Sequence, residues 1–347
     1  MEHIGMDLGK RESQIAILTE GGELIEKRIR TERPRLGEVF GDRPRARILL
    51  EAATESEWVA RCLEALGHEV IVADPNYAPM YAQRSRRIKT DRRDARALLS
   101  ACKSGTYKFA HRTSDARRHL RALLAVREGL VRTRARWISL SRTLLRRDGF
   151  RIRSGAPESF LARVAELAVP APLRAEIAPL LTLVAPVTDQ IKALDAQLAA
   201  LVHTDEVLQR LTTVPGVGPV TATSFVATVD DVQRFRGAHQ VQSYLGVVPQ
   251  EWSSSETQRK GRITKAGNSR TRWLLVEAAW TILRGRKQSD TAPLREWAER
   301  IRQRRGGPIA AVALARRLAG ILYAMWRDQT EYDPAKLRRG GAVQRAA

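Results

Sequence analysis

The sequence predicts an α/β sheet domain at the N-terminus, a long helical segment after it, and a mostly helical C-terminal domain. Short apolar runs separated by turn residues indicate the sheet, and a sevenfold apolar repeat in an arginine-rich stretch indicates the helices. A chain of 347 residues is long enough for two or three domains. The expected parts are a sheet domain over 1–110, a coiled-coil or helical linker over 111–206, a C-terminal domain over 207–335 and a basic flexible tail over 336–347.

The first part alternates strand-like and helical patterns. Apolar runs with Gly-centred turns between them predict three strands, and two more follow on either side of a helix. That helix, Glu55–Leu66, has apolar residues at helical spacing and is stopped by Gly67. A strand meander followed by alternating strands and helices predicts a mixed α/β sheet. The expected strands are His3–Asp7, Ser13–Leu18, Glu23–Arg30, Arg47–Leu50 and Val70–Ala73.

The stretch 112–153 holds thirteen arginines against three acids. Apolar pairs recur along it every seven residues, which predicts one long helix with a seam for a partner helix. Its outer face is arginine-rich, and Arg132 and Arg136 on it are candidate nucleic-acid contacts. A second helical stretch spans about 187–201, and the two could pair as an antiparallel hairpin or between subunits.

A Gly-rich turn, Pro215-Gly216-Val217-Gly218, stands between two helical stretches of the C-terminal part. It resembles a helix-hairpin-helix, in which backbone N–H groups at a helix N-terminus can hold a phosphate. Gly216 and Gly218 are therefore candidate nucleic-acid contacts. An ordinary glycine-rich helix connection is the alternative.

The charge balance points to a polyanionic partner. The chain has 60 Lys and Arg against 38 Asp and Glu, a formal net charge of +22 and a pI near 11.0. Such an excess of positive charge gives sequence-independent affinity for DNA or RNA. The alternative is a basic surface that only keeps the protein soluble. The two cysteines match no ligand spacing and fit a reducing compartment. No apolar run is expected to span a membrane, so we expect an intracellular protein.

Four acids stand where a ribonuclease-H-like sheet would bring them together. Asp7 and Glu51 end the first and fourth strands, and Asp91 and Asp94 share one face of an expected helix. Carboxylates suit Mg²⁺, which could clamp the oxygens of a phosphodiester. Taken singly, each acid could instead cap a turn or pair with an arginine. Basic neighbours that suit a nucleic-acid backbone are Arg84, Arg86, Arg87, Lys89, Arg92, Arg93 and Arg96.

A serine run, Ser253-Ser254-Ser255, leads into a stretch without acids. The basic residues of that stretch are Arg259, Lys260, Arg262, Lys265, Arg270 and Arg272. By spacing alone, a polar loop is the better interpretation. A serine nucleophile needs activation and a charged pocket, and with no histidine nearby these would come from the carboxylate–metal site or the arginines.

Several ordered blocks carry a resemblance to a known family. They are Gly5–Lys10, Leu50–Ala52 followed by Trp58, Lys89–Ala95, Val214–Pro219, Tyr244–Pro249, Gly261–Asn268 and Arg272–Ala279. Together they span nearly the whole chain and resemble the DEDD transposases of one insertion-sequence family, serine recombinases associated with a bridge RNA.

The resemblance implies a fold and a chemistry for each part. The N-terminal domain is similar to the Holliday-junction resolvase RuvC, and the four acids named above fall on the positions that bind Mg²⁺. A coiled coil would join it to a C-terminal transposase domain, whose serine attacks DNA and forms a covalent 5′-phosphoserine intermediate. A bridge RNA would pair with donor and target DNA. Dimers would assemble to a tetramer, in which one subunit's acids meet another's serine.

The serine block departs from the family pattern. The family has a Ser-Gly pair five and six residues after the proline of its Gly-x-x-Pro block, whereas Pro249 is followed here by Ser254 and Ser255. Counting from the proline makes Ser254 the expected nucleophile and Ser253 the runner-up, and losing the glycine changes backbone freedom. Two alternatives stay open: a metal-dependent Holliday-junction-type nuclease without a covalent intermediate, and a non-catalytic nucleic-acid-binding protein.

Overall fold

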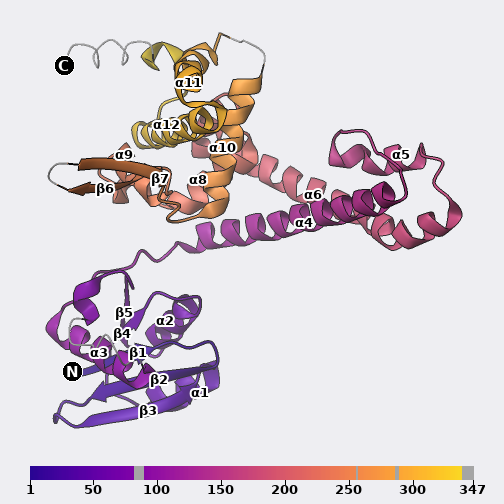
Figure 1. The fold of residues 1–347 in the computed structure, drawn as a ribbon. Helices are drawn as coiled ribbons and strands as arrows, with labels where there is room; N and C mark the ends of the chain where they lie inside the picture. Colours follow the sequence, from indigo (N-terminus) through magenta and orange to yellow (C-terminus); the bar gives the residue numbers. More distant parts are fainter. Residues whose placement is uncertain (82–89, 255–256, 286–288, 338–347) are drawn as a thin grey trace. The chain divides into compact units, whose positions relative to one another are not determined.

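The computed structural model describes residues 1–81, 90–254, 257–285 and 289–337 (Figure 1). The chain divides into two compact units, Met1–Thr113 and Ser114–Ala347. The long helices and the C-terminal domain thus fall within one unit. The finer boundaries expected from the sequence stay predictions.

The first unit is built on a five-stranded mixed sheet with the order β3-β2-β1-β4-β5. β1 pairs antiparallel with β2 and parallel with β4, β3 pairs antiparallel with β2, and β5 pairs parallel with β4. The prediction of a mixed α/β sheet is confirmed. Every expected strand is present within one residue of its expected bounds: β1 Glu2–Asp7, β2 Glu12–Leu18, β3 Leu24–Arg30, β4 Ala46–Glu51 and β5 Glu69–Ala73.

Helices cover both faces of this sheet. The strands bury alternate residues on opposite faces, so Ile48 and Leu50 contact the cluster that holds α1 and α2, while Leu49 contacts the cluster that holds α3. The sequence did not reveal α1, a short helix with a proline in its first turn. The helical elements are α1 Arg33–Phe40, α2 Ser56–Ala65, the 3₁₀ turn η1 Ala78–Tyr81 and α3 Asp91–Ser104.

Gly5 lets α3 lie directly on β1. A Cβ atom at this position would lie far inside van der Waals distance of the carbonyl oxygen of Ala95 and the amide nitrogen of Leu99. The glycine in the first motif block is therefore required for packing, because any side chain would push the helix off the sheet. This contact matters to the site, since α3 carries two of the four acids.

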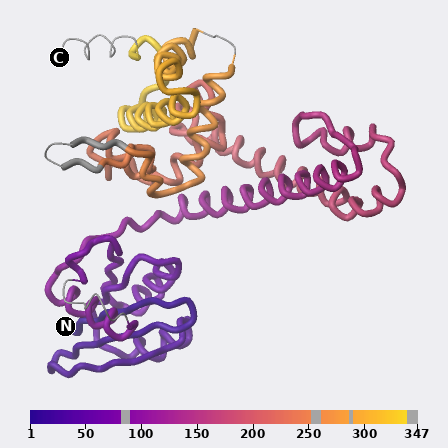
Figure 2. Tube along the Cα trace, in the orientation of Figure 1, coloured from indigo at the N-terminus to yellow at the C-terminus, as the bar shows by residue number. Residues whose placement is uncertain are grey.

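The second unit begins with an antiparallel helical hairpin (Figures 1 and 2). Arg127 of α4 pairs with Asp195 of α6, and further along α4 the buried Arg134 contacts Thr188, so the two helices run in opposite directions. The structure thus has these helices packed within one chain, one of the two arrangements left open above. Between them lie two short pieces. The elements are α4 Asp115–Arg147, η2 Pro157–Ser159, α5 Phe160–Ala165 and α6 Ala171–Thr204.

The rest of the second unit is a mostly helical bundle with a β-hairpin. The mostly helical character was predicted. Its core lies among α7, α8, α10, α11 and α12. The interpretation of the serine run as a polar loop is wrong for the backbones of Ser253 and Ser254, because these two residues end β6, which pairs antiparallel with β7. The elements are α7 Glu206–Thr212, α8 Pro219–Val229, η3 Val232–Arg234, α9 Ala238–Tyr244, β6 Pro249–Ser254, β7 Thr257–Ile263, α10 Ser269–Arg284, α11 Ala292–Arg305 and α12 Gly307–Asp328.

Two helices are long and apolar enough to cross a membrane by length and composition, contrary to the expectation of none. They are α6, with a mean hydropathy of 1.2 in its most apolar window, and α12, with 1.4. Half of that window of α12 is buried, against 22% for α6. Packing in the bundle core accounts for the apolar face of α12, as it does for core helices generally.

Candidate active site

The topology of the sheet brings Asp7 and Glu51 to the same edge. β1 and β4 are parallel neighbours with Met6 opposite Leu50, so the next residue of each strand lies at the carboxyl end of the sheet. Sites of α/β proteins lie at this edge because parallel strands all end there. The strand-end acids are therefore adjacent as a result of the fold.

Helix α3 supplies the other two acids from its first turn. The Thr90 side chain caps the helix by accepting a hydrogen bond from the amide of Arg93, which fixes where the helix starts. Asp91 and Asp94 then lie three residues apart on one side. Asp94 is only 5% exposed, while Asp91 is exposed. Because α3 packs on β1 through Gly5, this turn lies beside the strand ends.

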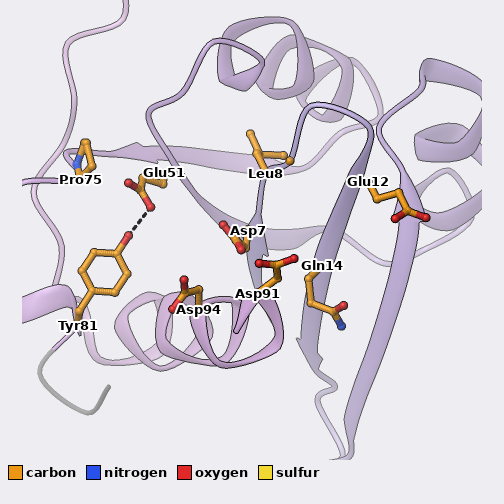
Figure 3. A pocket seen from close by; sticks show the side chains of 10 residues that line it. Asp7, Leu8, Glu12, Gln14, Glu51, Pro75, Tyr81, Asp91 and Asp94 are labelled. Atoms are coloured by element: carbon orange, nitrogen blue, oxygen red, sulfur yellow. Dashed lines mark hydrogen bonds between the residues drawn. The ribbon is translucent and has the colours of Figure 1, made fainter. Parts of the chain in front are cut away.

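One cavity of about 400 Å³ is lined by all four predicted acids (Figure 3). Sequence reasoning missed the other polar groups that line it. Gln14 could have been found, because it stands opposite Asp7 in the β1–β2 register. The complete lining is Asp7, Leu8, Gly9, Glu12, Gln14, Glu51, Pro75, Tyr81, Asp91 and Asp94.

Tyr81 closes one side of this cavity. Its hydroxyl donates a hydrogen bond to Glu51 Oε2 at 2.5 Å (Figure 3). Burial first, and then the Glu51 carboxylate, raise the pKa of Tyr81 far above its ordinary value. The phenol therefore stays a hydrogen-bond donor at any physiological pH. No sequence pattern singled it out, because it lies in a short 3₁₀ turn between two motif blocks.

The donor set fits a hard divalent cation. The four predicted carboxylates, with the Glu12 carboxylate and the Gln14 amide in the same lining, offer the oxygen ligands that Mg²⁺ prefers. Across the part of the chain that the structure describes, no three acidic, histidine or cysteine side chains stand close enough to hold one ion as placed. Binding of one ion by three or more of these acids would therefore need their side chains to rotate inside the cavity.

The arginines beside the acids are engaged within the protein. Arg92 and Arg96 on α3 both donate to the Glu26 carboxylate on β3. These hydrogen bonds, from Arg96 and then Arg92, lower the pKa of Glu26 to about 2. Arg93 is exposed. The predicted contacts Arg84, Arg86, Arg87 and Lys89 lie outside the described residues.

The serine block lies on the β-hairpin of the second unit. The backbones of Ser253 and Ser254 end β6, opposite Gln258 and Thr257. Their side chains, those of Arg259 and Lys260, and Ser255 altogether lie outside the described residues. Arg262 and Lys265 follow on the exposed surface.

The base of this hairpin is locked by backbone-to-backbone packing. Gly246 and Gly267 both have positive φ, and a Cβ on either would collide with the other's chain segment. The Arg272 guanidinium donates to the carbonyls of Leu245 and Ala266, which ties the two segments together. Burial lowers the pKa of Arg272. Two motif blocks thus form one rigid support beneath the serine-bearing strand.

Other predicted nucleic-acid contacts have roles inside the fold. Arg270 and the exposed Arg132 both pair with Glu128 of α4, whereas Arg136 is simply exposed. A Cβ on Gly216 would lie 2.8 Å from the Ala278 carbonyl oxygen, so this glycine has a packing role. Gly218 is exposed and directly precedes α8, so the glycine-rich turn connects α7 to α8, as both interpretations of this turn require.

The chain matches two models of known protein families. The model of the Transposase IS116/IS110/IS902 family matches residues 208–292, which include the glycine-rich turn and the serine block. A DEDD transposase model of the IS110 type matches residues 4–147, which include all four acids. The DEDD domain indicates dependence on a divalent metal.

Relatives match over nearly the whole chain. A probable family 20 transposase of Pseudomonas aeruginosa is 30% identical over 96% of this chain and 99% of its own length. The transposase of element IS1111A from Coxiella burnetii is 28% identical over 95% and 90%, and that of IS1328 from Yersinia enterocolitica 26% over 95% and 98%. These matches identify the class of this protein: it is a transposase, an enzyme that cleaves and rejoins DNA. The chain belongs to the IS110/IS116 transposase family.

Proposed function

We propose that this chain excises and inserts an insertion-sequence element through a Mg²⁺ site and a serine nucleophile. The observation that carries the proposal is the convergence of acids from three separate elements on one cavity, in a member of a transposase family. The metal-binding acids would be Asp7, Glu51, Asp91 and Asp94, and the nucleophile would be Ser254.

The two units would divide the chemistry. Bound Mg²⁺ would supply Lewis acidity toward the phosphodiester oxygens and neutralise their charge. The Ser254 hydroxyl oxygen would bond to phosphorus while the bond between phosphorus and the 3′ oxygen breaks. The serine proton would end on the departing 3′ hydroxyl. A 5′-phosphoserine link would result, and the reverse step on a second DNA end would rejoin the strands.

A DEDD designation refers to acids, so the serine chemistry needs a test of its own. We expect denaturing gels to show a covalent protein–DNA adduct with the unaltered chain and with Ser253→Ala, and none with Ser254→Ala. An adduct lost only in Ser253→Ala would move the nucleophile by one residue. Free DNA ends without any adduct would favour the junction-nuclease alternative instead.

The nucleic-acid partners would be the DNA of element ends and target, and a non-coding bridge RNA. The net charge of +22 and the exposed Arg93, Arg136, Arg262 and Lys265 support backbone contacts of this kind. After nuclease treatment has removed RNA from the protein, recombination should require addition of an RNA transcribed from the DNA that flanks the gene. Full activity without any RNA would contradict the proposal of a bridge RNA.

The chain would act as a dimer that assembles to a tetramer. The helical hairpin supports this, because α6 is apolar yet mostly exposed, with Leu183 47% exposed, and Val126 on α4 is 57% exposed. Mixing chains that carry Asp7→Asn with chains that carry Ser254→Ala should restore cleavage if acids and serine act from different subunits. Unrestored cleavage in mixed oligomers would contradict that arrangement.

We place this activity in the bacterial cytoplasm, at the nucleoid, because its substrate is chromosomal DNA. The packing of α12 in the bundle core supports this location. Cell fractionation should recover the chain with the nucleoid, and recovery with the membrane would contradict it.

A further inference from the structure

Tyr81 is held firmly at the edge of the acid cavity. Its ring packs against the buried cluster that includes Leu49, Ile71 and Leu98, on the face of the sheet covered by α3. Its hydroxyl reaches the Glu51 carboxylate, as the dashed line in Figure 3 shows. The ring position is therefore fixed by apolar packing, and the hydroxyl position follows from it.

The hydrogen bond constrains one oxygen of Glu51 and leaves the other for a ligand. Partners of this kind orient carboxylates that bind metals, and removing them costs about 10–100-fold in metal affinity. Glu51 has particular need of such a partner, because it shares the cavity with four other acids, Asp7, Glu12, Asp91 and Asp94, which repel it.

We propose that Tyr81 is a positioning residue, which orients the Glu51 carboxylate toward the divalent cation. The proposal rests on the metal site proposed above. It assigns a role to a residue outside the four acids that define the DEDD domain. Tyr81 would not contact the reacting phosphate, and its effect would act through Glu51.

The test measures Mn²⁺ affinity by calorimetry on the full chain. Tyr81→Phe keeps the ring packing and removes only the hydroxyl, so Mn²⁺ affinity should fall about 10–100-fold with little change in melting temperature. Tyr77→Phe is the matched control, because Tyr77 packs against the same cluster but does not line the cavity. Its affinity should be unchanged.

A double variant shows whether Tyr81 acts through Glu51. In a Glu51→Gln background, adding Tyr81→Phe should cause no further loss of Mn²⁺ affinity. Unchanged or tighter Mn²⁺ binding in Tyr81→Phe would overturn the positioning role. Failure of the unaltered chain to bind Mn²⁺ would instead overturn the metal site itself, so the two failures are distinguishable.

An independent observation concerns the end of α11. Four of its last six residues are arginines, Arg300, Arg302, Arg304 and Arg305, and all four are exposed. Arg302 pairs with Glu299. Among the residues that the structure describes, no carboxylate lies within ion-pair distance of the other three.

Other arginines of the bundle bind partners on other segments, whereas at this end of α11 the bonds stay within the helix: Arg302 pairs with Glu299, and Arg304 donates to the carbonyl of Arg300. Arg272 binds backbone carbonyls, Arg316 binds Gln242, and Arg317 stacks on Trp297. The buried residues of α11, such as Leu294 and Ala298, lie in its first half, so the last turn extends beyond the core. Interaction with the helix dipole favours positive charge at this end, but the arginines three and four residues apart also repel one another.

We infer that the end of α11 is a contact surface for the phosphate backbone of duplex DNA. Arginine is well suited to phosphate, and the family of this chain acts on DNA. The surface lies beyond residues 208–292, the part matched by the C-terminal family model. It would add sequence-independent affinity.

The test measures binding of a random-sequence DNA duplex by fluorescence anisotropy over a range of salt concentrations. The double variant Arg304→Gln/Arg305→Gln should reduce the salt slope by about 1–2, since each phosphate contact contributes about 0.9. Arg35→Gln/Arg45→Gln is the control, with the same charge change at two exposed positions of the first unit. Equal slopes for the two double variants would overturn the inference.

Discussion

The two units of this transposase use charged side chains in opposite ways. In Met1–Thr113, acids from three separate elements, β1, β4 and α3, line one cavity at the carboxyl edge of a sheet. In Ser114–Ala347, many of the arginines that dominate the sequence are bound to partners inside the protein. Arg121 binds the carbonyls of Ala227 and Thr228, and Arg134 contacts Glu158.

This difference separates two kinds of inference. Like charges brought together in a cavity repel each other, so they indicate a site that takes a ligand of opposite charge. An excess of arginines indicates a polyanionic partner for the chain as a whole, but it does not show which individual arginines contact that partner. Which of them remain available depends on folded-state bonds such as those of Arg270 and Arg272.

The largest effect should follow from removing one acid of the cavity. Asp7→Asn keeps the size of the side chain and removes its charge, so DNA cleavage should fall at least about 100-fold, the loss of several kcal/mol of metal-assisted stabilisation. Asp42→Asn is the control, because Asp42 is exposed and does not line the cavity. Equal cleavage rates for the two variants would show that the acid cavity of the first unit has no special role in DNA cleavage.

A second prediction concerns the contact that places α3 beside the strand ends. Gly5→Ala should lower the free energy of unfolding of the chain by about 1–3 kcal/mol, because the added methyl group collides with backbone atoms of α3. Urea titration measures this. Gly37→Ala in α1 meets open space and should change stability little or raise it by about 0.5–1 kcal/mol. Equal stability of the two variants would show that α3 does not pack closely on β1.

A third prediction separates structural arginines from available ones. Arg272→Gln should lower the free energy of unfolding by about 1–2 kcal/mol, because two carbonyls lose their donor, and leave the salt slope of DNA binding unchanged. Arg262→Gln should do the reverse, with stability unchanged and the slope smaller by about 0.9. The idea fails if Arg272→Gln alters the slope as much as Arg262→Gln does.

The smallest effect should come from the Glu26 ion pairs. The pKa of Glu26 is about 2, below the ordinary value of 4.5. The Glu26 ion pairs therefore stabilise the fold fully above pH 4.5, and this contribution is lost as pH falls toward 2. For a pair this close to solvent, the contribution is about 1 kcal/mol or less. Chemical unfolding should show Glu26→Gln less stable than the unaltered chain at pH 6. The gap should narrow as pH falls from 4.5, and a constant gap would contradict the pairing.

The sequence predicted the sheet and the acid cavity because both follow from local patterns. Apolar runs that end on Asp7 and Glu51, and the spacing of three residues between Asp91 and Asp94, are each visible in a few residues. The missed features depend on tertiary contacts. Tyr81 lines the cavity only because η1 folds back on the sheet, and the bonds of Arg272 depend on two distant segments meeting.

The serine run shows a different limit of sequence reasoning. Spacing alone favoured a polar loop, whereas pairing of β6 with β7 places Ser253 and Ser254 at a strand end. Pairing between strands can override the low strand propensity of a short polar segment. The identity of the nucleophile stays a prediction.

The central claim is that the four acids form one divalent-metal site. It is tested most directly by crystals of the full chain grown with Mn²⁺ and measured at the manganese absorption edge. We predict an anomalous peak inside the cavity, bound by carboxylate oxygens of Asp7, Glu51, Asp91 and Asp94. A cavity without manganese, or a peak bound by other residues, would contradict the account.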